Sequence, residues 1–545
     1  MRKWLLLLAA FLTLAGMLSA CNRNNPQTTA TPPSAPPPPP VILRIHFAGA
    51  DQISSNTNSL AFTNEFASTE AHALESQTLD KLSRAPGVWF KSKLPAGAGD
   101  GSAQLRPLLD DFLKSEWVFE MRGRTDSPEY ALAIRLDDAG ARLWETNLQN
   151  LLESWTKITV QNISNGWELK KDLPPNLLRF DRTNGWVIIG CGQNELPLAD
   201  EWVQSGMTSS HEPGWLSVLV DWQRLGQVFP ALAKFDFPAT SMQAIGMNGN
   251  FLVNGKFELS QPLPALDQWQ IPTNLIHQPL SSFTAARGFG PWLQNQSWAR
   301  LFGLSPEPNQ LYSWTLASGP MEGYTAFPVP NATNELTQID QNLTANTNWQ
   351  KHFLITFQKT VTTNRISWQG FPFISPEIRA LQEANGDFLL MDVFPIPPFG
   401  RPVPSELYEA FRRDKVVFYH WEITAPRLKA LPELTQFALV LTKHRQFEMN
   451  SAAGRWLSAI GPTLGNSVTE AEQTGPSELT FTRTAPAGLT AVELIALANW
   501  LEAPNFPGCD LSLPSHARPH GHVKTLSAPV PVPAGVAAPM PPKPH

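Results

Sequence analysis

The feature that most constrains the fold of this chain is a weak internal repeat. Trp167 precedes Asn184-Gly185 by seventeen residues, and Trp368 precedes Asn385-Gly386 by the same interval. Further matches follow in the same order, at offsets between 194 and 201 residues: Tyr130 with Tyr324, Trp155 with Trp349, Pro175 with Pro376, Arg179 with Arg379, and Val220-Asp221-Trp222 with Tyr419-His420-Trp421. This pattern predicts two tandem modules of about 200 residues, a pair rather than a long array. The alternative is that Trp-rich strands merely resemble one another.

Hydrophobic periodicity predicts the content of a module. Leucine and phenylalanine recur at helical spacing from Ser102 to Ser115, and Trp117 to Arg122 and Tyr130 to Leu136 alternate as in a hairpin. Asn184-Gly185 separates two apolar runs and is typical of a two-residue hairpin turn, in which both central residues need positive φ. The expected fold class is therefore α+β: two duplicated modules, each an antiparallel sheet with helices packed on one face.

Two helix starts are also expected. Asp138 precedes a run of apolar residues at helical spacing and is a candidate N-cap. Thr490 and Glu493 have the spacing of a capping box at the start of the last helix.

Composition divides the chain into a body and two ends. Seven of the ten residues from Thr31 to Pro40 are proline, which favours an extended tether, and residues 508–545 are rich in proline and histidine. We expect a signal peptide at residues 1–20, a tether at 21–42, one module at 43–285, a second at 286–507 and a flexible tail at 508–545.

The N-terminus contains a specific targeting signal. Arg2 and Lys3 precede an apolar stretch from Trp4 to Leu18 that is too short to span a membrane stably, and Leu18-Ser19-Ala20-Cys21 follows. This order resembles the lipobox of bacterial lipoproteins, in which the cysteine is acylated and becomes the first residue of the mature chain. The resemblance covers residues 1–21 only. An ordinary secretory signal with an incidental cysteine is the alternative.

The resemblance implies a location. Asn22 occupies the position where lipoproteins retained in the inner membrane usually have Asp, so a Gram-negative cell would send this protein to the outer membrane. Several acyl chains would anchor it firmly, because one chain alone binds a membrane only marginally. The net charge of −6 argues against a nucleic-acid partner, which requires a concentrated basic surface.

Histidine and cysteine are the candidates for metal binding and cross-linking. His516, His520 and His522 lie near Cys509 and could ligate zinc or copper, but neighbouring prolines and Gly521 prevent a helix that would preorganise them. A flexible tail is the favoured interpretation. Cys191 ends an apolar run and is expected to be buried, although it could pair with Cys509 in an oxidising compartment.

Three catalytic patterns are rejected. Ser154-x-x-Lys157 has the spacing found in penicillin-binding enzymes, but its serine lies at the end of a predicted helix rather than at the start. Gly249-x5-Gly255-Lys256 has one residue too many for a phosphate loop, and a hairpin is expected there. The adjacent carboxylates Asp110-Asp111 and Asp137-Asp138 are interpreted as solvated helix and cap residues. An acid pair assembled only by the fold stays open.

The sequence therefore favours an outer-membrane lipoprotein that binds or scaffolds another envelope component, a protein, glycan or lipid, without catalysis and without a cofactor. Most of the tryptophans are expected in cores, whereas Trp89 and Trp292 could present flat apolar surfaces to glycan or lipid. Two other functions stay open: an envelope hydrolase with its site in the cleft between the modules, and a carrier of a hydrophobic ligand in an apolar groove.

Replacing the lipobox cysteine tests the anchor. Cys21→Ser removes the acylated thiol, so the protein should move from the membrane pellet to the soluble fraction. The measurement is immunoblotting of both fractions beside the unaltered chain. A variant that stays in the membrane would exclude the lipobox.

Overall fold

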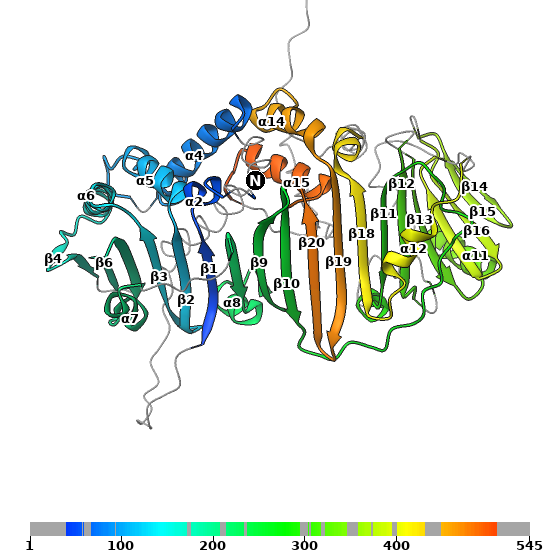
Figure 1. Cartoon of the computed structure of the whole chain (residues 1–545), viewed down its shortest axis with the longest axis horizontal. Coiled ribbons are helices and arrows are strands. Elements are labelled where there is room, and N and C mark those ends of the chain that lie inside the picture. Colours follow the sequence, from blue (N-terminus) through cyan, green and yellow to red (C-terminus); the bar gives the residue numbers. More distant parts are fainter. Residues whose placement is uncertain are drawn as a thin grey trace, which may run out of the picture. The chain divides into compact units, whose positions relative to one another are not determined.

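The computed structural model describes residues 40–508 except for residues 57, 59–66, 93, 172–175, 208–213, 234–236, 295–303, 305–306, 318–321, 346–357, 372–373, 395–399 and 431–447. The described part mixes helices with a single antiparallel sheet of 20 strands (Figure 1). The α+β class is therefore confirmed. None of the described helices is long and apolar enough to cross a membrane.

The first ten strands come from the N-terminal half of the chain: β1 (Val41–Phe47), β2 (Trp117–Arg124), β3 (Ser127–Arg135), β4 (Gln161–Ile163), β5 (Gly166–Lys170), β6 (Leu177–Thr183), β7 (Trp186–Gly192), β8 (Leu216–Val220), β9 (Ala239–Met247) and β10 (Asn250–Glu258). The other ten follow in the C-terminal half: β11 (Leu280–Arg287), β12 (Gln310–Leu316), β13 (Gly323–Val329), β14 (Gln358–Thr362), β15 (Arg365–Gln369), β16 (Glu377–Glu383), β17 (Gly386–Asp392), β18 (Val416–Ile423), β19 (Asn466–Gly475) and β20 (Glu478–Ala485).

The strand order repeats between the two halves. From one edge to the centre the hydrogen-bonded order is β4-β5-β6-β7-β3-β2-β1-β8-β9-β10. From the other edge it is β14-β15-β16-β17-β13-β12-β11-β18-β19-β20. Adding ten to each strand number of the first half therefore gives the order of the second half.

The two halves join through their last strands. β10 and β20 pair antiparallel over eight residues, from Phe251 opposite Ala485 to Glu258 opposite Glu478, and Figure 1 shows them side by side. The prediction of two separate sheets was wrong. Pairing removes two exposed sheet edges, and alternating residues give no sign of whether a strand lies at an edge or in the centre. The expected boundary between residues 285 and 286 lies within β11.

The helices are α2 (Ala50–Ser54), α4 (Thr69–Trp89), α5 (Ser102–Lys114), α6 (Asp138–Thr156), α7 (Pro197–Ser205), α8 (Trp222–Val228), α9 (Gly290–Gln294), α11 (Ala332–Ala345), α12 (Ser405–Phe411), α14 (Ala452–Ile460) with the 3-10 turn η5 (Gly461–Thr463), and α15 (Ala491–Glu502). The helix expected from Ser102 is confirmed as α5. The capping box of Thr490 and Glu493 is confirmed at α15, whereas the N-cap of α6 is Asp137 rather than Asp138.

Helices pack on both faces of the sheet. In β2, Trp117 and Phe119 belong to the core beneath α5 and α6, while Val118 packs with Leu198 and Trp202 of α7 on the opposite face. We name these the Trp117 face and the Val118 face. The prediction that helices pack on one face only was therefore wrong, because both sets of alternating side chains in β3 and β7 are apolar and need cover.

The same alternation places the other cores. Residues that pair across two strands lie on the same face of the sheet, so the face of each residue can be followed from strand to strand. The strand residues that pack against α11 lie on the Trp117 face, and those that pack against α12 lie on the Val118 face. These helices follow β13 and β17, as α6 and α7 follow β3 and β7. A further cluster packs α4 against α14 and α15, and Lys81 of α4 donates to the carbonyl oxygen of Leu501 at 2.7 Å. The halves are thus joined by helices as well as by strands.

The repeated residues lie on corresponding strands. Trp167 and Trp368 lie on β5 and β15, and Arg179 and Arg379 lie on β6 and β16. Tyr130 and Tyr324 lie on β3 and β13 but pack into cores on opposite faces, so this match of sequence is not an equivalence of position.

The first hairpin turn behaves as predicted. Asn184 and Gly185 have φ of 47° and 79° between paired residues Thr183 and Trp186. In the second half the two turn residues are 384 and 385, one position before the expected pair, because Glu383 pairs directly with Gly386.

Changing Asn184-Gly185 to Val-Val should destabilise the chain by roughly 2–4 kcal/mol, because a β-branched residue at positive φ is strained at both positions. Urea unfolding measures the effect. Thr183→Val, in the strand beside the turn, is the control and should change the free energy of unfolding little. Equal stability of the two variants would contradict this account of the turn.

Candidate functional site

The Trp117 face carries different chemistry in the two halves. On β1 and β2 it is an apolar core that includes Phe47, Trp117 and Phe119. On the corresponding strands of the second half and on β19 the same face carries polar side chains: Ser282 and Thr284 on β11, Thr315 on β12, His420 and Glu422 on β18, and Ser467 and Thr469 on β19. We call this set the polar network. Burying polar side chains is costly unless each is hydrogen-bonded, so this difference needs a physical account.

Glu422 is the centre of the polar network. It is fully buried, and its Oε1 accepts hydrogen bonds from the backbone N–H of Ala491 at 2.7 Å and from the hydroxyl of Thr424 at 3.1 Å. Burial alone would raise the pKa of Glu422, but the nearby imidazole of His420 and the hydrogen bonds from Ala491 and Thr424 outweigh it and lower the pKa. The charge also lies at the N-terminus of α15, where a carboxylate is favoured. Glu422 therefore fixes α15 to the sheet.

His420 links Glu422 to a hydroxyl group. Its Nδ1 lies 2.8 Å from Thr284 Oγ1, and its Nε2 lies 3.5 Å from Glu422 Oε2. Hydroxyl, imidazole and carboxylate occur in this order in nucleophilic hydrolases. The second distance is at the limit of a hydrogen bond, and Glu422 Oε2 and His420 Nε2 have no hydrogen-bond partner among the described residues.

Two arginines complete the polar network. Arg427, in the helical residues 424–430, donates to Thr315 Oγ1 at 2.9 Å, and burial lowers its pKa. Arg483 of β20 donates to Thr469 Oγ1 and to Glu493 of α15, both at 2.8 Å. The polar network thus extends from β12 to β20 beneath α15.

An apolar row lies beside the polar network on the same face. It runs across five strands at the centre of the sheet: Met242 on β9, Gly255 on β10, Phe481 on β20, Ala471 on β19 and Phe418 on β18. Each is partly exposed, and none belongs to a buried core among the described residues. Phe257, one row further, stacks on Phe481 with ring centroids 5.0 Å apart.

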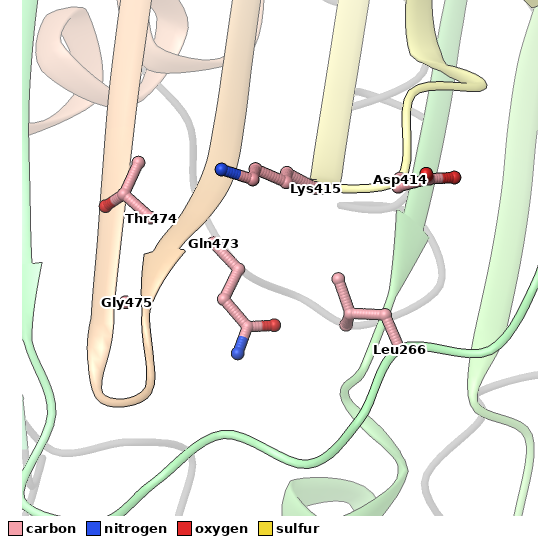
Figure 2. Close-up of a pocket in the computed structure, with 6 residues that line it drawn as sticks. All are labelled: Leu266, Asp414, Lys415, Gln473, Thr474 and Gly475. Atoms are coloured by element: carbon pink, nitrogen blue, oxygen red, sulfur yellow. The ribbon is translucent and has the colours of Figure 1, made fainter.

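The row ends near an open depression of about 330 Å3. Its lining comes from the two residues before β18, from β19 and from the segment between the halves: Leu266, Asp414, Lys415, Gln473, Thr474 and Gly475. Figure 2 shows the ammonium group of Lys415 extending toward β19 and the carboxyl group of Asp414 pointing the other way. Gln473 shares the Trp117 face with Ala471, two residues away on β19.

The fold also assembles an acid pair, which the sequence left open. Glu377 and Asp392 are buried and directly opposite one another on β16 and β17. Arg379 lies between them, with Nε 2.8 Å from Glu377 and Nη2 2.7 Å from Asp392. Burial raises the pKa of both carboxyls. The ion pairs with Arg379 account for this cluster as a structural one.

The residues singled out from the sequence fall into two groups. Cys21, Cys509, His516, His520 and His522 lie outside the described residues, so lipidation, the disulfide and the metal site stay predictions. In the part that the structure describes, no group of three or more His, Cys, Asp and Glu side chains could hold a metal ion.

The other group is described. Cys191 is buried on β7, as expected, and Trp89 is partly exposed at the end of α4. The sequence Gly249 to Lys256 forms the predicted hairpin of β9 and β10. Ser154 lies in the last turn of α6 and donates to the carbonyl oxygen of Leu151, which agrees with its rejection as a nucleophile.

Two of the rejected carboxylates take structural roles. Asp111 accepts from the indole N–H of Trp144 at 3.1 Å, and the Asp137 side chain accepts from the backbone N–H of Gly140 at 2.7 Å.

Sequence reasoning missed both the polar network and the apolar row. Thr284 and His420 are 136 residues apart, and Glu422 and Ala491 are 69 apart, so no short motif joins them. The available signal was polar alternation, as in Ser282 with Thr284 and His420 with Glu422.

No known family model and no curated protein matches the chain. One similar solved structure is crystal form I of TP0453; the match covers 43% of this chain and all of that chain, with 7% sequence identity and a TM-score of 0.23. A TM-score this low supports no inference.

Glu422→Gln tests the central carboxylate. The lowered pKa means that the charge of Glu422 stabilises the fold above the ordinary carboxyl pKa, and that this contribution is lost as pH falls through the folded-state pKa. The variant should lose about 1–3 kcal/mol at pH 7 and progressively less below about pH 4. Urea unfolding across pH measures this, with Glu258→Gln on β10 as an exposed control. A deficit that does not change with pH would contradict the charge assignment.

Proposed function

We propose that the protein is a lipid-anchored, non-catalytic binding or scaffolding protein of the bacterial outer membrane. The lipobox ending at Cys21 supports the anchor, and the proline-rich tether that follows supports a body held away from the lipid. At about 3.1 Å per residue, residues 22–40 would reach roughly 60 Å. The partner would be another envelope component, a protein, a glycan or a lipid.

The apolar row is the observation that carries this proposal. An antiparallel sheet usually turns its apolar face to a core and its polar face to water. At the centre of this sheet the Val118 face is polar, with Asn254, Lys256 and Thr482 on β10 and β20. The Trp117 face is apolar there, yet partly exposed. Exposed apolar surface that is bordered by polar groups is typical of interaction sites.

We also propose that the two halves arose by tandem duplication. The repeated strand order supports this, as do the corresponding positions of α6 with α11 and of α7 with α12. Duplication would place two copies of one edge strand side by side in the same sheet. The binding surface would then be twice as wide as the surface of a single half.

A hydrolase is the second candidate, and one observation favours it: the arrangement of Thr284, His420 and Glu422. Its site would lie within the second half. The sequence suggested a cleft between the modules. Where the two halves meet, β10 instead pairs continuously with β20, and we call this junction the seam.

The test uses the full chain carrying Cys21→Ser, incubated with envelope extract and recovered by affinity capture. We expect an extract component to co-purify with this protein and also with its Thr284→Val variant. The Ala471→Trp variant should not capture that component, because the tryptophan fills the apolar row. Thr482→Trp on the polar face is the matched control and should retain it. Mass spectrometry identifies the component.

Two results would contradict the proposal. One is capture that Ala471→Trp and Thr482→Trp affect equally. The other is turnover of an extract component that Thr284→Val abolishes, which would establish the hydrolase instead.

A further inference from the structure

We infer that the apolar row and the open depression form one site for an anionic amphiphile with a single acyl chain, such as a medium-chain fatty acid. This inference rests on the proposed binding function and names its ligand class. Four properties of the site support it: its shape, its closed end, its polar end and its length.

The proposed acyl site crosses the apolar row along β19; we call this strip of surface over Ala471 the groove. Ala471 is small and lies between Phe481 of β20 and Phe418 of β18. The Phe481 ring leans away from Ala471 over Gly255, where an added Cβ would lie only 2.0 Å from the ring. Glycine at position 255 thus allows Phe481 to stack on Phe257 and leaves the surface over Ala471 open between two aromatic walls.

Polar groups close one end of the groove. Beyond Ala471 on β19 comes Thr469, which is buried under the guanidinium group of Arg483. On one side Arg483 is held by Glu493 of α15, and on the other side His420 is held by Thr284. An apolar chain would end here, because going further would displace these hydrogen bonds without replacing them.

The other end opens into the depression, which offers groups for an anion. Gln473 and Lys415 supply an amide and an ammonium group, whereas the hydroxyl of Thr474 already donates to Glu478 at 2.8 Å. Lys415 extends toward β19 while the carboxyl group of Asp414 points the other way (Figure 2). The positive charge of the depression therefore faces the end of the groove, and the carboxylate that lines the depression does not.

The length of the groove determines how long an acyl chain it can hold. From Gln473 to Thr469 is four residues along an extended strand, about 13 Å, which matches an extended chain of roughly ten carbons. A carboxylate at Lys415 with ten to twelve carbons thus fits between the depression and Arg483.

Calorimetric titration with dodecanoate tests the inference on the full chain carrying Cys21→Ser, which requires no detergent. We expect one binding site, binding weakened roughly tenfold or more by Ala471→Trp, and no change with Thr482→Trp. Lys415→Gln should weaken dodecanoate binding but leave binding of dodecanol unchanged, because only the head group contacts Lys415. Circular dichroism of each variant checks that it is folded. If Ala471→Trp fails to fold, the dodecanoate and dodecanol titrations of Lys415→Gln, which changes an exposed residue, still test the inference.

Failure of the inference is distinguishable from failure of the proposed function. Absence of dodecanoate binding, or binding that neither Ala471→Trp nor Lys415→Gln weakens, overturns the amphiphile. The proposed function would still stand if Ala471→Trp abolished capture of an envelope component, and a captured protein or glycan would then replace the amphiphile as the ligand.

Discussion

The antiparallel pairing of β10 with β20 is the interaction on which the rest of the structure depends. Each strand is the last of its half, and each would otherwise expose a row of unpaired backbone N–H and C=O groups. Pairing them provides hydrogen-bond partners for backbone groups along eight residues of each strand. It leaves β4 and β14, which have three and five residues, as the edges of the sheet in the described part of the chain. Edge strands this short are weak templates for pairing with other chains.

The same pairing determines where a binding site can lie. Because the seam is continuous sheet, it offers a surface rather than a cleft, and side chains from both halves stand in one row on that surface. Gly255 comes from the first half, and Phe481, Ala471 and Phe418 come from the second. Neither half alone would present Phe481 stacked over Gly255 beside an open Ala471. The site that we propose is therefore a product of the association of the halves.

Local features of the fold could be predicted from the sequence, and long-range ones could not. The Asn184-Gly185 turn and the Thr490–Glu493 capping box depend on residues close together in the chain, and both are confirmed. The seam could not be predicted, because an edge strand and a central strand show the same alternation. The contact between Glu422 and Ala491 was equally hidden, since a buried carboxylate at a helix N-terminus leaves no trace in local spacing.

The two halves bury their polar side chains on opposite faces of the sheet. Strands at corresponding positions in the two halves would be expected to bury similar side chains on the same face. Instead, β1 and β2 bury apolar side chains on the Trp117 face and the polar His46 and Glu120 on the Val118 face, whereas β11 and β18 bury the apolar Phe283 on the Val118 face and Glu422 on the Trp117 face. Keeping buried charges costs free energy unless they are paired, and an apolar replacement of the same shape is often neutral or stabilising. Both halves supply such partners: Glu120 pairs with Arg122 in the first half, and Glu422 accepts from Thr424 and Ala491 in the second. In each half a buried carboxylate also accepts hydrogen bonds from the N-terminus of a helix: Glu129 from α7, and Glu422 from α15. This contact is therefore one way in which both halves hold a helix against the sheet.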